Sequence, residues 1–276
     1  MSDLVQLMVP PFAAGLVILS IHAYLGLHVI ARGVIFVDLA FAQIAALGST
    51  VGLLVGVEHG TPASLGFAFG FTLLGALIFS FSRMERSIVP QEAIIGITYV
   101  VASAAVILLA GLTAEGAEHL RETLTGTLIW VGWPEIVRMA AVYVVLGIFY
   151  YAFRRPLLAV SFDRDTAKKR PMWDFLFYVS FGVAISLSVG VAGVLLVFSL
   201  LVIPAVIAFL FTRRFSVALL LAWGSGTVAL VLGLVISFTW DIATGPFLVV
   251  AYGAVLALAF VVRAFTKADP GSEVTL

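Results

Sequence analysis

The chain consists of long apolar runs separated by short polar segments. Nine of these runs are about as long as the roughly 20 residues that an α-helix needs to cross a bilayer. Within them apolar residues follow one another without the alternation of a transmembrane β-barrel strand. We therefore expect an all-α polytopic membrane protein with one transmembrane domain over 1–276. The nine predicted spans are 8–31, 35–57, 63–82, 92–113, 134–153, 174–190, 192–212, 217–238 and 246–265.

The number of spans depends on one short segment. The region 174–212 is a single apolar stretch interrupted only by "SVGVAG". We interpret this Gly-rich segment as a turn, which makes nine spans, whereas a continuous helix would leave eight.

Composition supports lipid as the main solvent of the chain and limits the kinds of binding and catalytic site that it can form. Hydrophobic residues make up 62% of the chain and charged residues 11%, against about a quarter charged in soluble domains. Cysteine is absent and the net charge is zero, so thiolate metal sites are excluded and no nucleic-acid partner is indicated. The sequence contains no P-loop motif, so the chain does not bind ATP in that way. We also find no nucleophile paired with a base, and expect no enzyme activity.

The basic residues predict the orientation. With nine spans, all but Arg121 and Arg138 of the 15 Lys and Arg residues fall on one side. The positive-inside rule makes that side cytoplasmic. We expect a plasma (inner) membrane protein with its N-terminus outside and its polar C-terminal tail, 267–276, inside.

Five polar side chains within the spans are candidates for a cation pathway. An ionisable group at that depth costs roughly 2.5–3.5 kcal/mol on insertion scales and is usually functional. The segment "RGVIFVDLAFAQIAALGSTVG" carries Asp38 and Gln43, a later span begins at Glu92, and the first span carries His22 and His28.

These five residues also allow interpretations without a pathway. Asp38 fits a wet position near the cytoplasmic end, or an ion pair with Arg32 or His28. Glu92 fits a first-turn carboxylate that the helix dipole favours, and His22 fits a histidine hydrogen-bonded to a neighbouring helix.

The cytoplasmic loop 154–173, "RRPLLAVSFDRDTAKKRPMW", is amphipathic. One face would carry Leu157, Leu158 and Phe162, and the other Asp163, Arg164, Asp165 and Lys168. It fits a basic loop lying against lipid headgroups, and equally a short helix that docks into a partner protein.

Several motifs in order along nearly the whole chain resemble one family, the membrane permease subunits of zinc, manganese and iron importers of the ATP-binding-cassette class. The family's Gly-Val-Leu-Leu-Val and Ile-Pro-Ala segments match 193–197 and 203–205, and its Asp-x-x-x-Gly-Pro matches Asp241, Gly245 and Pro246. Upstream, "SFDRDTA" matches the Phe-Asp-Pro-Glu-x-Ala stretch at Phe162, Asp163 and Ala167. "EAIIGI" and "LTGTLIWV" match the acidic-x-Ile-Gly and Leu-x-Gly-x-Leu segments.

The resemblance implies a function and partners. It implies a homodimeric pathway for a divalent metal ion as substrate, with no tightly bound cofactor. It also implies two cytoplasmic ATPase subunits, an extracellular metal-binding protein, and a coupling role for the segment 157–170. Pro204 in the Ile-Pro-Ala segment is expected to free a backbone carbonyl and permit a kink.

The opening segment departs from the family pattern, which is Gly-Asp-Ala with a His four residues after the Asp. Here Val37 precedes Asp38, and Ala42 stands four residues later. Alignment on Gly48 instead places Gln43 in the His position, about 140° around an ideal helix from Asp38. The family resemblance therefore does not identify the metal that this chain transports. A gradient-driven secondary transporter or cation channel remains the main alternative, and a structural membrane scaffold a further one.

Overall fold

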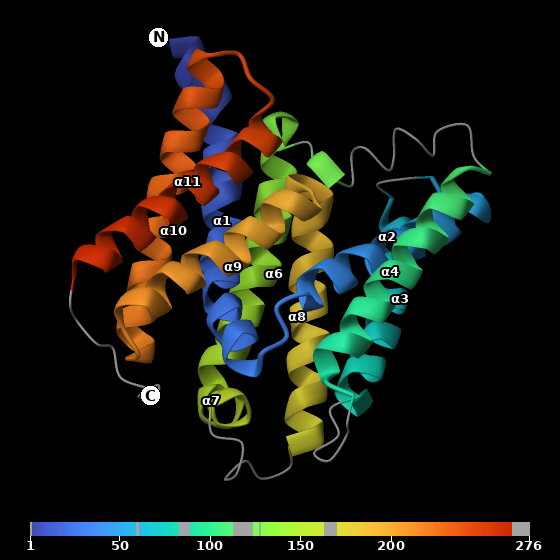
Figure 1. Cartoon of the computed structure of the whole chain (residues 1–276). Coiled ribbons are helices and arrows are strands. Elements are labelled where there is room, and N and C mark those ends of the chain that lie inside the picture. Colours follow the sequence, from blue (N-terminus) through green and yellow to red (C-terminus); the bar gives the residue numbers. More distant parts are fainter. Residues whose placement is uncertain are drawn as a thin grey trace.

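The computed structural model describes residues 2–58, 61–82, 89–112, 124–126, 128–162 and 170–266. Every regular element named in this part of the chain is a helix (Figure 1). In order they are α1 (Ser2–Arg32), α2 (Val37–Leu54), α3 (Pro62–Ser82), α4 (Gln91–Ala110), η1 (Leu128–Trp130), α6 (Trp133–Ala152), α7 (Arg154–Phe162), α8 (Arg170–Ala192), α9 (Val194–Phe211), α10 (Phe215–Thr239) and α11 (Thr244–Phe265).

Nine helices in the described ranges are long and apolar enough to cross a membrane, which confirms the nine predicted spans. The decisive point is the segment "SVGVAG". Gly193 separates α8 from α9 with φ 76° and ψ 159°, a backbone region that is essentially restricted to glycine. The predicted turn is therefore confirmed, and the eight-span alternative is wrong.

Some helix ends differ from the predicted spans by a few residues. α2 is shorter than 35–57 because glycines with positive φ, Gly33 and Gly56, stand on both sides of it. α8 begins at Arg170, four residues before the predicted 174. Its first turn begins with Arg170 and Pro171, which do not continue the apolar run, so hydropathy alone does not mark it as part of the helix.

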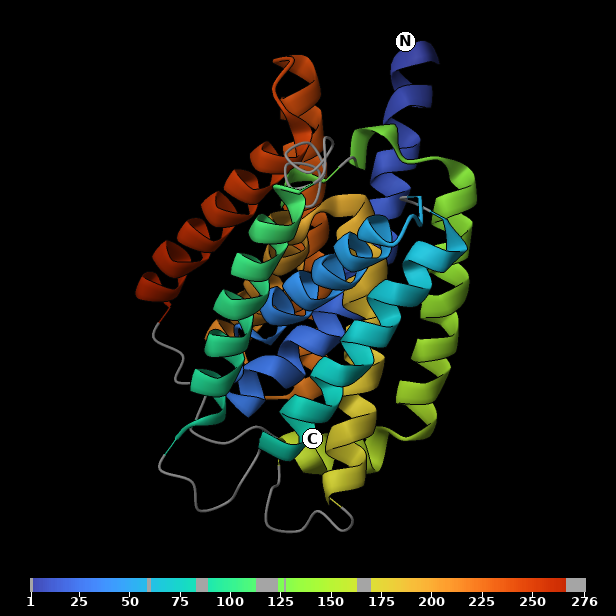
Figure 2. The same cartoon turned by 90° about the vertical axis from the view of Figure 1, so that its right-hand side faces the viewer.

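The bundle has inner and outer helices. About two-thirds of the apolar window is buried in α1, α2, α8 and α9, but only a third or less in the other spanning helices. In Figure 1, α2 and α9 run obliquely to the steep α1 and α8, and α3 and α4 cover α2 on one side. Figure 2 shows the same arrangement from the side of α3 and α4. Most buried polar side chains lie on these inner helices, so the chemistry of the chain is concentrated there.

The two ends of the bundle are distinct. The N-terminus and the turn between α10 and α11 lie at one end, and α7 lies at the other (Figure 1). Because α1 runs the length of the bundle, its last turn reaches α7, against which it packs.

Candidate functional site

Asp38 lies in the first turn of α2 and is 1% exposed. Neither of its carboxylate oxygens has a hydrogen-bond partner. The expected ion pair with Arg32 or His28 is therefore absent, and the wet position near the helix end is not found. The positive end of the α2 dipole favours a carboxylate here, but only partly offsets its burial. Both oxygens remain available to an incoming cation.

α2 is enclosed by other helices, which explains why its polar residues are buried on more than one face. It packs against α3, α4, α8 and α9. Gln43, about 140° around the helix from Asp38 by ideal geometry, is 4% exposed. The two side chains thus share a buried helix without sharing a face.

Glu92 connects α4 to the start of α2. Its Oε1 atom accepts a hydrogen bond of 3.1 Å from the backbone amide of Phe36, whereas Oε2 is buried without a partner. Phe36 is the N-cap residue of α2, and no side chain of its own caps that helix. Glu92 is in the first turn of α4 as expected, and it also supplies the acceptor that the first turn of α2 needs.

His22 is hydrogen-bonded at both ring nitrogens. Nδ1 lies 2.9 Å from the carbonyl oxygen of Ile18, and Nε2 lies 3.1 Å from the hydroxyl of Ser188 on α8. A carbonyl can only accept, so Nδ1 carries the hydrogen. The structure therefore places His22 in a contact between neighbouring helices, which is the alternative without a pathway role.

His28 belongs to a buried polar cluster at the α7 end, which we call the Ser161 cluster: His28, Arg32, Ser161 and Asp174. The Ser161 hydroxyl lies 2.7 Å from His28 Nδ1 and 2.9 Å from Arg32 Nε. Arg32 Nη1 forms an ion pair of 2.7 Å with Asp174 Oδ1. All four residues are less than 5% exposed.

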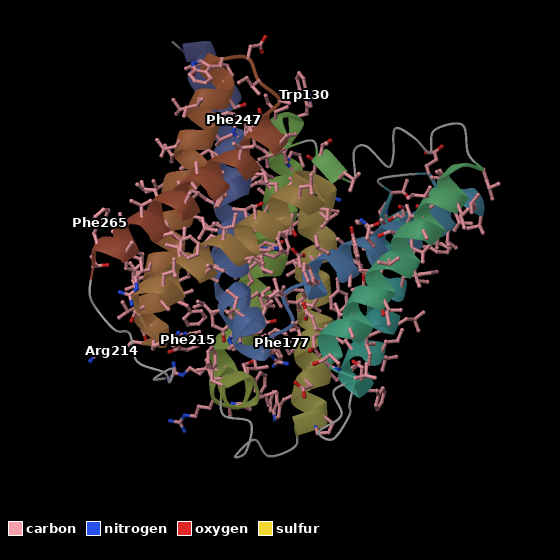
Figure 3. The ribbon with its side chains drawn as sticks, in the orientation of Figure 1. Trp130, Phe177, Arg214, Phe215, Phe247 and Phe265 are labelled. Atoms are coloured by element: carbon pink, nitrogen blue, oxygen red, sulfur yellow. The ribbon has the colours of Figure 1, made fainter. Side chains whose placement is uncertain are left out.

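Aromatic rings cover the Ser161 cluster. The Arg32 guanidinium carbon lies 3.7 Å from the centre of the Phe177 ring. His28 contacts the rings of Phe177 and Phe215, and Figure 3 shows these two phenylalanines on either side of the end of α1. A guanidinium over an aromatic face is favourable, more so without water. Sequence reasoning missed Arg32 and Asp174 as a pair, although opposite charges at the ends of two predicted spans were a usable signal.

The amphipathic loop is partly a helix. α7 covers Arg154–Phe162, with Leu157 fully buried and Leu158 and Phe162 packed against the core. The polar face named for this loop, Asp163, Arg164, Asp165 and Lys168, and the motif residue Ala167 lie outside the described residues. The apolar face of the segment is thus directed into the bundle.

Three glycines from different family motifs, Gly126, Gly193 and Gly245, lie near one another at the end of the bundle that holds the N-terminus. A Cβ atom on Gly193 would overlap the amide nitrogen of Gly126, and one on Gly245 would overlap the carbonyl oxygen of Thr125. The Leu-x-Gly-x-Leu segment therefore passes between the α8–α9 turn and the start of α11. Gly126 was not among the candidate residues, although its position in a family motif was a signal.

The other motif residues have local roles in the backbone. Asp241 has φ 52° and ends α10, a conformation that Asp tolerates better than most residues. Pro246 lies in the first turn of α11, where a missing N–H has little cost. Pro204 lies inside α9 and is buried, and it deprives the Leu200 carbonyl of its usual helical donor.

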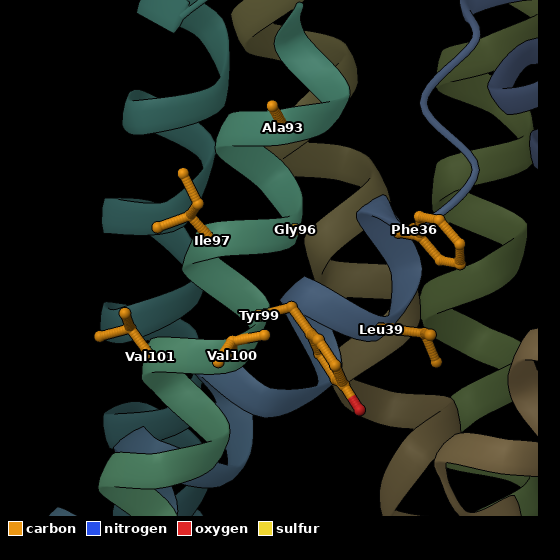
Figure 4. Close-up of a pocket in the computed structure, with 8 residues that line it drawn as sticks. All are labelled: Phe36, Leu39, Ala93, Gly96, Ile97, Tyr99, Val100 and Val101. Atoms are coloured by element: carbon orange, nitrogen blue, oxygen red, sulfur yellow. The ribbon is translucent and has the colours of Figure 1, made fainter.

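The described helices also carry an apolar hollow of about 590 Å³ between α2 and α4 (Figure 4). Phe36 and Leu39, on either side of Asp38 in the sequence, line it together with Gly96 and Tyr99 of α4. Asp38 itself does not line it. The hollow supplies no ligand atoms of its own, but it brings the surface of the bundle close to the start of α2.

The candidates do not form a metal cage within one chain. Among the described residues, no three His, Asp or Glu side chains gather into a group able to hold a metal ion. Asp38 and Glu92 are connected through the start of α2, His22 lies against α8, and His28 lies in the Ser161 cluster. The described part of a single chain therefore shows an unpartnered carboxylate at Asp38 and no closed metal-binding site.

Comparisons with known proteins place the chain among transport proteins. The chain is 24% identical over 255 residues to the manganese transport system membrane protein MntC of Halalkalibacterium halodurans, covering 90% of this chain and 84% of that protein. It is 24% identical to the manganese import system permease protein ScaB of Streptococcus parasanguinis, over 85% and 83% of the two chains. A probable iron transport system membrane protein of Haemophilus influenzae is 23% identical, over 89% and 90%.

Solved structures share the fold. PsaBC from Streptococcus pneumoniae, in complex with Fab, matches with a TM-score of 0.78 at 22% identity, over 97% of this chain and 95% of that one. An inward-facing putative metal-chelate type ABC transporter matches with a TM-score of 0.66 at 20% identity, over 93% and 85%. A model of the ABC 3 transport family matches residues 4–264, nearly the whole chain. The resemblance drawn from the sequence motifs is thus confirmed, and the chain belongs to the ABC 3 transport family.

Proposed function

We propose that this chain is the permease subunit of an ATP-driven importer of divalent metal ions, with manganese, iron or zinc as cargo. Two copies would form the pathway, and separate cytoplasmic ATPase subunits would hydrolyse ATP. An extracellular metal-binding protein would deliver the ion. Membership of the family supports the class of transporter, and the named activities of several relatives support the metal.

The observation that carries the proposal is the state of Asp38. A carboxylate that is buried without any hydrogen-bond partner is costly to keep and needs a compensating use. A divalent cation passing through is such a use, since hard cations prefer oxygen ligands. One carboxylate per chain binds weakly, which suits a pathway that must release its ion, and a second copy would bring a second Asp38.

The position of α7 supports the coupling role. α7 lies at the end of the bundle opposite the N-terminus, which the positive-inside rule assigns to the cytoplasm. Its exposed residues include Arg154 and Arg155, and its apolar face is anchored in the bundle. A helix fastened on one side and exposed on the other is suited to transmit a partner's movement.

Transport measured in proteoliposomes tests the proposal. We expect the chain, reconstituted with its ATPase and supplied with its metal-binding protein, to move radioactive manganese only when ATP is present, and Asp38→Asn to abolish that movement. Glu58→Gln, which neutralises an exposed acid, is the matched control and keeps full transport. Transport without the ATPase would favour the gradient-driven alternative. Failure with manganese, iron and zinc alike would overturn the proposal.

A further inference from the structure

The Ser161 cluster joins three helices that meet at the α7 end of the bundle. Ser161 is on α7, His28 and Arg32 are in the last part of α1, and Asp174 is near the start of α8. The family motif residues matched above include none of these four residues, and His28 is the one pathway candidate among them. Such a buried ionic cluster is costly to build, and a hydrophobic replacement is often at least as stable. Stability alone is therefore a weak reason for it.

The hydroxyl of Ser161 is used completely. It has one hydrogen and two lone pairs. The hydrogen goes to the Leu157 carbonyl at 3.0 Å, and the lone pairs accept from Arg32 Nε–H at 2.9 Å and from His28 Nδ1–H at 2.7 Å. In this arrangement all three bonding positions of the hydroxyl are occupied. α7 is thus attached to α1 by two bonds that cannot slip without breaking.

From Arg32 the chain continues to Asp38 through a short, tightly bonded turn. Gly33 N donates to the Ile30 carbonyl at 3.1 Å, and Val34 N donates to the Val29 carbonyl at 3.3 Å. Val37 N, the first residue of α2, donates back to the Val34 carbonyl at 3.1 Å. The turn is short and hydrogen-bonded to both helices, so we expect a displacement of the last turn of α1 to displace the first turn of α2.

A second attachment holds the other side of α2. Glu92 Oε1 accepts from the Phe36 amide, so the helix that carries Asp38 is fixed between α4 and the last turn of α1. If α4 stays in place while α1 moves, the first turn of α2 rotates or tilts about this contact. Either movement changes which surroundings the Asp38 carboxylate faces.

We propose that Arg32 is a positioning residue that couples α7 to Asp38. Its hydrogen bond to Ser161 makes it move with α7, and its ion pair with Asp174 makes it move with α8. Through the 33–36 turn it sets the position of the first turn of α2. The inference rests on the proposed function, and it assigns the path by which ATP-driven movement of α7 reaches the pathway. It needs no large rearrangement, since every link in the path is a contact of the resting structure.

The absence of cysteine makes a direct test simple. A single cysteine in place of Phe36, which is 49% exposed, carries an environment-sensitive fluorophore on the first turn of α2. The labelled chain is assembled with its ATPase in lipid vesicles and supplied with its metal-binding protein, and fluorescence, ATP hydrolysis and manganese transport are measured together. In the labelled chain that is otherwise unaltered we expect a fluorescence change when ATP binds.

Ser161→Ala is the principal variant, because alanine keeps α7 helical and removes only the hydroxyl. We expect ATP hydrolysis to continue, the fluorescence change at position 36 to be lost, and the manganese ions moved per ATP to fall roughly fivefold or more. Ser225→Ala, which removes a hydroxyl bonded only within α10, is the matched control and leaves all three readouts unchanged. A residue with only a structural role would lower ATP hydrolysis and transport together.

A second variant keeps the test decisive if Ser161→Ala does not assemble. Asp174→Asn retains an oxygen acceptor and removes the charge that holds Arg32, and we expect the same separation of ATP hydrolysis from transport in weaker form. An ATP-dependent fluorescence change of normal size in either assembled variant would overturn the inference and leave the proposed function intact. No fluorescence change and no transport in the unaltered labelled complex would remove the proposed function and this inference with it.

Discussion

The backbones of Gly126 and Gly193 touch, although the two residues belong to different motifs and are separated by α6, α7 and α8. Both have positive φ, 71° and 76°. Each glycine therefore serves twice, by adopting a backbone conformation closed to other residues and by leaving room for its neighbour. The start of α9 is fixed against the segment before η1 by this contact.

Gly193→Ala should destabilise the bundle strongly. The backbone strain alone is about 1–3 kcal/mol, and the added methyl group would overlap the Gly126 amide. We expect a lower melting temperature in detergent, measured by the fluorescence of the native tryptophans. Gly190→Ala, near the end of α8 where a Cβ meets open space, is the control and should be neutral or stabilising by up to about 1 kcal/mol. Equal melting temperatures for the two variants would contradict the proposed fit.

Glu92 variants separate a positioning role from a pathway role. Glu92→Gln keeps an oxygen that can accept from Phe36 N, whereas Glu92→Ala removes it. A hydrogen bond to a charged group contributes roughly 1.5–3 kcal/mol, so we expect the Ala variant to lose most transport and the Gln variant to keep most of it. The measurement is ATP-driven manganese uptake at matched protein levels. If Glu92→Gln were as inactive as Glu92→Ala, the negative charge itself would be needed and Glu92 would contact the ion.

Asp38→Asn should stabilise the resting protein while it abolishes transport. The wild-type carboxylate is buried without a partner, and Asn carries no charge, so the substitution removes the additional cost of burying an unpaired charge. The expected result is a higher melting temperature together with lost uptake, a trade often seen at functional sites. A lower melting temperature would show that the carboxylate is held by contacts that help the fold.

The orientation can be checked with single cysteines. Trp240, 69% exposed in the turn between α10 and α11, and Thr266, at the end of α11, lie at opposite ends of α11. We expect a membrane-impermeant maleimide added to intact cells to label Trp240→Cys, and to label Thr266→Cys only after the membrane is opened. The reverse pattern would invert the assignment of α7 to the cytoplasm, and with it the proposed ATPase contact.

The spanning helices were predictable because lipid forces each helix to satisfy its own backbone hydrogen bonds, so that hydropathy reports each span locally. The turn at Gly193 was predictable for a similar reason, since the glycine-rich break is legible in the sequence. The start of α8 was not, because Arg170 and Pro171 interrupt the apolar run there.

The hydrogen-bond partners of the candidate residues could not be predicted from the sequence around them. Hydropathy marked Asp38, Glu92, His22 and His28 alike as unusual polar residues within spans. It could not tell that His22 and His28 have hydrogen-bond partners on other helices while Asp38 has none. That difference depends on which helices pack together, and the sequence carries no local trace of it.

By itself the sequence determined that this is a polytopic membrane protein, where most of its spans lie, and which family it belongs to, because these properties depend on local composition and motif order. Only the tertiary structure decided that Arg32 pairs with Asp174, that Glu92 holds the start of α2, and that three motif glycines meet at one end. Each of these contacts joins residues distant in the chain. Close packing of rigid helices, which leaves a buried polar group few possible partners, selects among them.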